Sequence, residues 1–218
     1  MSFKKKKYAV MKNVISKDLA SFLCKYLVLK REVYKTLNNS RYISPYDTDW
    51  GCFTDKQVPD TFVMYADVAM ETLLGTLRDV MEKETKLKLI PTYSFVRLYK
   101  KGDILHRHKD RFSCEISTTL NLGGDPWPIY VEAKKNIGIH DPNKGLYVPT
   151  NNKGTKINLE PGDMMLYRGR ELEHWRETFE GEECAQVFLH YNEDTKENRK
   201  NIFDSRAHLG LPAQLKQK

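Results

Sequence analysis

The sequence predicts a mainly β fold of the α+β class, in which helices precede a β-sandwich or barrel. Two segments with helical periodicity come first, and eight short segments with strand character follow from Pro91 onward. The length of 218 residues suits a single domain with a substantial core. We therefore expect one domain, 1–218, with helical support and a loop in 1–90, a β core in 91–191 and a C-terminal tail in 192–218.

The first predicted helix follows Ser16, whose side chain can cap it, and Asp18 in its first turn suits the positive end of the helix dipole. Residues 38–59 are loop-like, because Asn, Ser, Pro and Gly interrupt any period. We expect Asp60 to cap the second helix. The predicted buried residues of the two helices are Leu19, Phe22, Leu23, Tyr26 and Leu27, and then Ala66, Ala69, Leu73, Leu77 and Val80.

Short strands account for most of the remaining chain. They are rich in β-branched and aromatic residues and are separated by Gly, Pro, Asn and Asp. The predicted strands are 92–99, 104–108, 113–122, 128–133, 155–159, 163–168, 172–177 and 183–191. The interval 136–153 is polar and rich in Asn, Gly and Pro, so we expect a long insertion between strands, of the kind that often forms a lid or a binding loop.

The formal net charge of +7 makes the surface attractive to anions. Much of the excess lies in Lys4–Lys7 and in Lys216 and Lys218, which we expect to belong to solvated tails. No basic stripe alternates with aromatic residues, and no helix-turn-helix or zinc-finger spacing is present. We therefore expect no nucleic-acid partner.

The four cysteines are far apart and include no Cys-x-x-Cys pair, so we expect free thiols rather than a zinc site or a disulfide framework. No apolar run approaches the roughly 18 residues that a membrane-spanning helix needs. We expect no membrane association and a cytoplasmic location, and the sequence does not indicate an oligomeric state.

His108 and Asp110 lie two residues apart at the end of a predicted strand. Because strand side chains alternate between faces, both can reach one metal ion. His174, in a later strand beyond the turn at 161–163, is the candidate third ligand. Two histidines and one carboxylate leave coordination positions open, a pattern that favours Fe(II) over zinc. His106 shares a face with His108 and is an alternative ligand.

The residues around this triad carry a family resemblance. In the first half they are Arg97, Tyr99, Gly102, the His108-x-Asp110 pair and the strand 117–122; in the second half they are Pro161-Gly162-Asp163, an apolar strand, His174, Gly181 and the strand 187–191. This pattern resembles the prolyl 4-hydroxylase-like branch of the Fe(II)/2-oxoglutarate dioxygenases. The resemblance spans residues 92–191 and implies a double-stranded β-helix, or jelly roll, with N-terminal supporting helices.

The resemblance also implies an activity. His108, Asp110 and His174 would hold the catalytic iron, while Tyr99 and Thr119 would hydrogen-bond the cosubstrate 2-oxoglutarate. The implied reaction hydroxylates a peptidyl proline or another amino-acid side chain, in a peptide or a free amino acid, and releases succinate and CO₂. Ascorbate would keep the iron reduced, as it does in relatives.

One residue that the family usually has is missing. A Lys or Arg shortly after the distal histidine normally holds the far carboxylate of 2-oxoglutarate, but this chain has Glu183, Cys184, Ala185 and Gln186 there. Another guanidinium must then supply the charge. Arg176 is the first choice, because strand parity gives it the same face as His174. Arg97, which shares a face with Tyr99, is the second.

Several alternatives stay open at this level. Arg176 could instead form a surface ion pair with Glu173 or Glu177. His190 lies either near the cosubstrate or in the core as a hydrogen-bonded histidine, and Trp127, Trp175 and Tyr130 either line the pocket or pack in the core. Two other functional classes also fit: a non-catalytic jelly-roll binding module, and a cupin-like metal enzyme that does not use 2-oxoglutarate.

Overall fold

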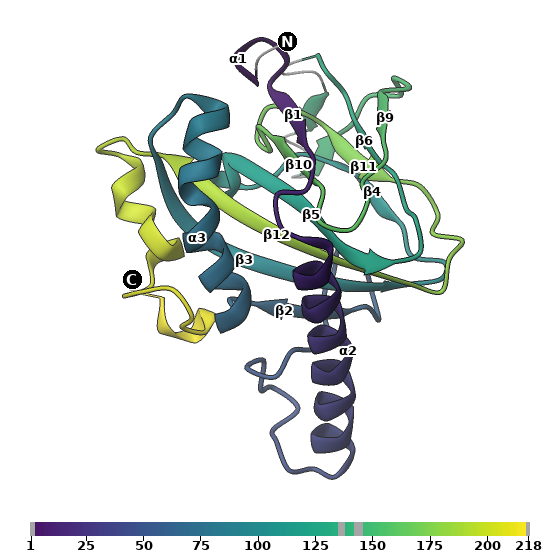
Figure 1. Cartoon of the computed structure of the whole chain (residues 1–218). Coiled ribbons are helices and arrows are strands. Elements are labelled where there is room, and N and C mark those ends of the chain that lie inside the picture. The colour runs from purple at the N-terminus through teal and green to yellow at the C-terminus, as the bar shows by residue number, and fades with distance from the viewer. Residues whose placement is uncertain (1–2, 135–137, 142–145, 217–218) are drawn as a thin grey trace.

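The fold is built on two antiparallel sheets, seen in a computed structural model that describes residues 3–134, 138–141 and 146–216 (Figure 1). The major sheet comprises β1 (Tyr8–Met11), β2 (Phe62–Tyr65), β3 (Leu89–Lys100), β5 (Ile116–Gly124), β10 (Met164–Tyr167) and β12 (Glu183–Glu193), in the order β1-β10-β5-β12-β3-β2. The minor sheet comprises β4 (Leu105–His108), β6 (Ile129–Val131), β9 (Thr155–Ile157) and β11 (His174–Arg176), in the order β4-β11-β6-β9. The predicted mainly β, α+β class is confirmed.

The helices cover the outer face of the major sheet. They are α1 (Phe3–Lys6), α2 (Lys17–Asn39) and α3 (Val68–Thr85). Three 3₁₀ turns occur later in the chain: η1 (Phe112–Cys114) between β4 and β5, and η2 (Asn198–Ser205) and η3 (Ala213–Leu215) after β12. α2 packs against β5, and α3 packs against β3 and β12, while the far end of α2 projects beyond the sheet (Figure 1). The inner face of the major sheet is therefore left for the minor sheet and for the site between them.

The first helix begins as predicted, because the Ser16 hydroxyl accepts a hydrogen bond from the Leu19 amide at 3.1 Å. Its predicted buried stripe is partly wrong. Leu23 and Leu27 are buried, but Leu19 and Phe22 are 41% and 66% exposed. A single helix resting on a sheet buries only a narrow stripe, and the apolar residues beside that stripe face solvent.

The second helix begins after Asp67, so the predicted cap at Asp60 is wrong. The Asp67 carboxylate accepts hydrogen bonds from the amides of Ala69 and Met70, and the preceding residues form β2, paired with β3. The run from Phe62 to Tyr65 is apolar at every position, which suits an extended segment buried against a neighbouring strand. The predicted buried residue Val80 is 38% exposed.

Both chain ends take part in the fold, so the expectation of solvated tails at Lys4–Lys7 and Lys216 is wrong. Phe3 is buried, and β1 adds an edge strand beside β10. The Lys216 ammonium pairs with the buried carboxylate of Asp204 at 2.5 Å, and Lys218 lies outside the described residues. The N-terminal end contributes Phe3 to the core, and the C-terminal end contributes Lys216 as a partner of the buried Asp204.

The predicted insertion at 136–153 is not wholly irregular. It contains a two-stranded hairpin, β7 (Ile139–Asp141) and β8 (Leu146–Val148), whereas residues 136–137 and 142–145 lie outside the described part. Beyond β8, the Thr150 hydroxyl and amide bind the buried Glu173 carboxylate next to His174. The segment is thereby attached to the outer side of β11.

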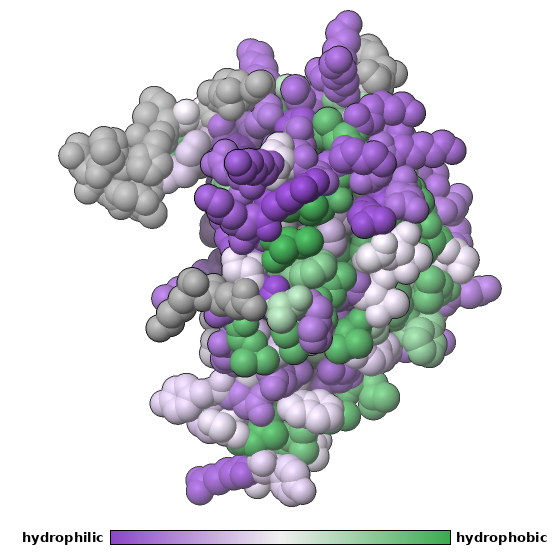
Figure 2. Space-filling view, turned by 90° about the vertical axis from the view of Figure 1, so that its left-hand side faces the viewer, coloured by the Kyte–Doolittle hydropathy of each residue, from purple (hydrophilic) through white to green (hydrophobic). Residues whose placement is uncertain are grey.

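The surface is mixed in character. Figure 2 shows hydrophilic side chains over the upper part of one side, with apolar and polar residues interspersed lower down. Among the helices of the described residues, none is long and apolar enough to cross a bilayer. All four cysteines are free thiols, as predicted.

Candidate metal centre

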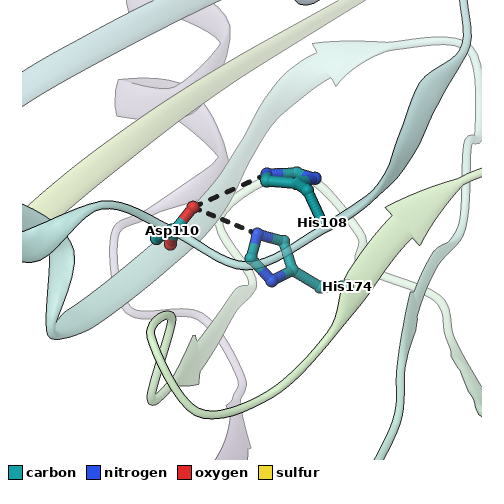
Figure 3. Close-up of side chains that lie close together, drawn as sticks. All are labelled: His108, Asp110 and His174. Carbon is teal, nitrogen blue, oxygen red and sulfur yellow. Dashed lines mark ion pairs between the residues drawn. The ribbon is translucent and has the colours of Figure 1, made fainter. Parts of the chain in front are cut away.

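Three side chains from two segments of the chain converge at the edge of the minor sheet (Figure 3). His108 ends β4, His174 begins β11, and the two residues lie directly opposite each other in the antiparallel pair. Asp110 follows β4, with its Oδ1 3.6 Å from the Nε2 of His108 and 3.3 Å from that of His174. One donor atom from each residue lies within 4.8 Å of the others, so a single metal ion can be held by all three.

Backbone hydrogen bonds fix the orientation of both imidazoles. The Nδ1 of His108 lies 2.7 Å from the carbonyl oxygen of His106, and the Nδ1 of His174 lies 3.1 Å from that of Leu172. Because a carbonyl oxygen only accepts, each Nδ1 carries the proton and each Nε2 presents its lone pair. Both Nε2 atoms face Asp110, which is the arrangement that metal ligation requires.

Asp110 is held from two directions. Its backbone amide donates to the Gly169 carbonyl at 2.9 Å, and the Ser117 hydroxyl donates to its Oδ2 at 2.7 Å. Ser117 Oγ also lies 3.0 Å from the Nδ1 of the buried His190, which therefore acts as the donor in that contact. The Oδ2 atom is thus occupied, and Oδ1 remains directed at the two histidines.

The surroundings of His108 and Asp110 favour the protonation states that metal ligation needs. Burial lowers the pKa of His108, and the neighbouring His174 lowers it further, so this ring is neutral at physiological pH. Burial alone would raise the pKa of Asp110, but the neighbouring His174 and His108 hold it well below its usual range. Asp110 is therefore ionised, as a metal ligand must be.

A pocket of about 280 Å³ opens beside the triad. Its lining consists of Gln57, Tyr93, Phe95, Arg97, Leu105, His108, Lys109, Asp110, Arg111, Cys114, Tyr167, His174, Phe188 and His190. His106 is exposed and absent from this lining, and its side chain does not join the triad. Trp127, Trp175 and Tyr130 are also absent, so these aromatics pack in the structure rather than line the pocket.

Arg176 is fully buried between the two sheets, 1% exposed, and not at the surface. It forms no ion pair with a residue of the described chain. The two acidic residues weighed as surface partners bind elsewhere: Glu173 pairs with Arg107, and Glu177 accepts from Tyr130. The interpretation of Arg176 as a surface ion pair is therefore wrong, and its guanidinium is a buried charge without an anion.

Arg176 lies next to Thr119, which was predicted to bind the cosubstrate, and near Gln186, where the family's basic residue is missing. Its guanidinium donates to the carbonyl of Trp127 and, at 3.2 Å, to the hydroxyl of Thr119. That hydroxyl donates in turn to Gln186 at 2.9 Å. The Thr119 hydroxyl thus links Arg176 to Gln186, which stands where the family usually has a basic residue. The cation in this region comes from β11, whereas Gln186 belongs to β12.

Two buried polar atoms in this region lack hydrogen-bond partners within the described chain, the Tyr99 hydroxyl and the Arg176 Nε. Buried polar groups are nearly always paired, so these two atoms are candidates to bind a ligand or solvent, although Tyr99, Thr119 and Arg176 are not among the residues that line the pocket. Arg97 differs, because its Nε binds Asp55 at 2.7 Å and its Nη2 binds Gln57 at 2.5 Å. The charge of Arg97 is already compensated.

Sequence reasoning missed Arg111 as a wall of the pocket. Its guanidinium binds both carboxylate oxygens of the buried Asp204, at 3.2 and 2.9 Å. Asp204 is presented by three consecutive residues with left-handed backbone, Phe203, Asp204 and Ser205, at φ 53°, 55° and 65°. This conformation is costly for residues other than glycine and tends to occur at functional sites. No local pattern linked Arg111 to residues so distant in the sequence.

The comparisons with known proteins concern the fold. No family model and no curated protein matches the chain. Similar solved structures include a prolyl-4-hydroxylase of Pseudomonas putida (14% identity, 88% of this chain and 96% of that chain covered, TM-score 0.55) and a viral collagen prolyl hydroxylase from Paramecium bursaria Chlorella virus-1 (12%, 86% and 97%, 0.54). Another is the non-heme α-ketoglutarate-dependent epimerase SnoN from nogalamycin biosynthesis (12%, 88% and 81%, 0.61).

These similarities show that the chain has the jelly-roll fold found in 2-oxoglutarate-dependent oxygenases, as predicted. The neighbours include prolyl hydroxylases and other enzymes at comparable similarity, so they do not single out one branch. Fold and site together define a jelly roll with a 2-His-1-carboxylate cluster at the edge of its minor sheet.

Proposed function

We propose that this chain is an Fe(II)- and 2-oxoglutarate-dependent oxygenase that hydroxylates its substrate and releases succinate and CO₂. The observation that carries the proposal is the convergence of His108, Asp110 and His174 within 4.8 Å beside an open pocket. The donor set suits Fe(II), because it occupies three positions and leaves room for a bidentate oxo-acid and O₂. Similar solved structures include a viral collagen prolyl hydroxylase in complex with 2-oxoglutarate and the epimerase SnoN in complex with Fe³⁺ and α-ketoglutarate.

The second part of the proposal assigns Arg176 to the distal carboxylate of 2-oxoglutarate, with Tyr99 as a hydrogen-bond donor and Thr119 as a second donor once its hydroxyl turns from Gln186 to the ligand. A fully buried guanidinium without an anion is costly, and a carboxylate would satisfy it with charge-assisted hydrogen bonds. The unpaired Tyr99 hydroxyl and Arg176 Nε supply two donors for the same group. Arg97 is the weaker choice because Asp55 already neutralises it.

Iron and 2-oxoglutarate, when bound, supply the oxidising power for the reaction with O₂. The chain's own contribution is to hold the ligands in one geometry, to keep Asp110 ionised and to position the substrate. Phe95, Phe188 and Leu105 give the pocket apolar walls, which exclude water from the reacting centre.

The substrate that we propose is an amino-acid side chain, in a peptide or a free amino acid. Two of the similar structures are prolyl hydroxylases, which supports a prolyl group as the first substrate to test. Ascorbate as the reductant and a cytoplasmic location remain predictions.

The decisive experiment is an anaerobic titration of the purified chain with Fe(II) and 2-oxoglutarate, followed through the metal-to-ligand charge-transfer absorption. A band that requires both components, and that gives succinate and CO₂ once O₂ is admitted, supports the proposal. Iron binding without a 2-oxoglutarate band would favour the cupin-like alternative. A band without succinate formation, either alone or with prolyl peptides and free amino acids, would favour the non-catalytic module.

A further inference from the structure

One wall of the pocket is a row of aromatic side chains with a cation at each end. Tyr93, Phe95 and Arg97 alternate along β3 and therefore face the same side of the sheet. The Arg97 guanidinium lies 5.1 Å from the ring of Phe95, and that of Arg111 lies 4.6 Å from the ring of Tyr93. Phe188, on the neighbouring strand β12, completes the wall at 5.6 Å from Arg97.

Three cationic side chains line the pocket, and carboxylates outside the lining pair with two of them. Its cations are Arg97, Lys109 and Arg111, and its one carboxylate among the described residues is Asp110, which a bound metal would use. Asp55 and Asp204 hold the two guanidiniums from outside this lining. Lys109 lies over the ring of Tyr147 and forms no ion pair in the described part of the chain. A pocket of this charge favours an anionic ligand.

Arg97 is already paired with Asp55, but it is the best oriented of the three cations to donate one further hydrogen bond to that ligand. Its side chain is 8% exposed and is fixed through Nε and Nη2 by Asp55 and Gln57. No hydrogen bond within 3.5 Å joins its remaining nitrogen, Nη1, to the described chain, although the guanidinium also interacts with the neighbouring Tyr99 hydroxyl. A guanidinium held in one orientation with one nitrogen free binds a carboxylate at little entropic cost.

We propose that the substrate carries a carboxylate, which Arg97 binds while the apolar part of the substrate packs on Tyr93, Phe95 and Phe188. The oxidation of this substrate rests on the proposed oxygenase function, but the binding of its carboxylate by Arg97 does not. Arg97 is the specificity-determining residue, and Lys109 and Arg111 contribute a weaker, salt-dependent attraction. The proposal narrows the substrate to a free amino acid, an acidic side chain or another small carboxylic acid.

The test uses two probes of matched shape, 3-phenylpropanoate and 3-phenylpropanamide, titrated calorimetrically into the metal-free full-length chain. We expect the carboxylate to bind about tenfold more tightly than the amide, since a charge-assisted hydrogen bond is worth about that ratio. Arg97→Gln should remove this preference. Arg78→Gln, which changes an exposed guanidinium on α3, is the matched control and should retain it. Equal binding of the two probes, or a preference that survives in Arg97→Gln, overturns the proposal.

A second variant guards against misfolding of the first. Asp55→Asn removes the carboxylate that competes for Arg97, so it should tighten 3-phenylpropanoate binding, in the direction opposite to Arg97→Gln. Weaker binding by Asp55→Asn contradicts the proposal.

A last measurement separates this role from that of the cosubstrate clamp. In the Fe(II) titration, Arg97→Gln should bind 2-oxoglutarate within about threefold of the unmodified chain, since an indirect effect amounts to well under 1 kcal/mol. A loss of a hundredfold would assign Arg97 to 2-oxoglutarate and overturn the proposal. If the unmodified chain shows no charge-transfer band, the oxygenase function fails, and the probe titrations still decide whether Arg97 binds a carboxylate.

Discussion

His174 lies directly opposite His108 across the antiparallel pair β11 and β4, with ring centroids 4.2 Å apart. The pairing aligns the two Nε2 atoms on Asp110, which follows one of the two strands (Figure 3). The site is therefore fixed by strand register, and its single carboxylate comes from a short connection whose backbone is bonded to Gly169. This division of roles suggests which substitutions will affect metal binding and which will affect the fold.

Asp110→Ala should abolish iron-dependent turnover and weaken Fe(II) binding by about a hundredfold or more, because a ligand is lost and even partners outside the coordination sphere are worth about 10–100-fold. The fold should persist, since the side chain is a ligand and not a packing group. Fe(II) affinity and circular dichroism together check both statements. Asp194→Ala, at a partly exposed carboxylate that pairs with Arg199, is the control. Unchanged turnover in Asp110→Ala would reject the assignment.

Gly169→Ala should weaken Fe(II) binding by about tenfold or more without changing any ligand. A Cβ at this position would clash with Asp110 Oδ2 and lie 2.6 Å from Ser117 Oγ, so the carboxylate must move. Gly75→Ala is the matched control, because its nearest neighbour would be Leu209 at 3.9 Å. That substitution in α3 should leave Fe(II) binding unchanged and stabilise the chain by about 0.5–1 kcal/mol in urea unfolding. Equal iron affinity in both variants would show that Gly169 does not set the position of Asp110.

Arg176→Met should affect cosubstrate binding and stability in opposite directions. The affinity for 2-oxoglutarate should fall by about a hundredfold, the loss expected when a buried charge-assisted pair is broken. The unfolding free energy of the ligand-free chain should stay level or rise by about 1–4 kcal/mol, because a buried guanidinium without an anion costs more than a packed apolar side chain. The charge-transfer titration and urea unfolding measure the two effects; unchanged 2-oxoglutarate affinity would rule out Arg176 as the clamp.

The stability of the metal-free chain should fall between pH 6.5 and pH 4. Burial lowers the pKa of His190 from 6.5 to about 4, so the unfolded state binds more protons than the folded state in this window. The stabilisation is fully present above pH 6.5 and is lost as the pH falls, by about 3 kcal/mol at most for this group. His108 acts in the same direction.

His190→Gln isolates the contribution of His190 to this pH dependence. Glutamine keeps a donor for Ser117 but does not titrate. Urea unfolding at pH 7 and pH 4.5 should show a smaller difference for the variant than for the unmodified chain. An equal difference would mean that other groups account for the acid sensitivity.

Much of the site follows from local periodicity. Strand alternation predicted a common direction for His108 and Asp110, and the two side chains do meet, although Asp110 lies just beyond the end of β4. The cap at Ser16 fixed the start of α2. The same reasoning failed at Asp60, where a capping residue precedes an apolar run that pairs with β3. A side chain of the right type does not decide between helix and strand when a neighbouring strand can bury the segment.

The sequence by itself determined the class of fold, the pair His108 and Asp110 on one side of their segment, and the absence of a basic residue near Gln186. The tertiary structure alone decided that His174 faces this pair, that Arg176 is buried without an anion, and that Asp204 orders Arg111. The physical reason is the distance along the chain over which each feature is decided. Alternation within a strand depends on neighbouring residues. The meeting of distant residues depends on the register of whole sheets, and the packed core decides which charges are left without a partner.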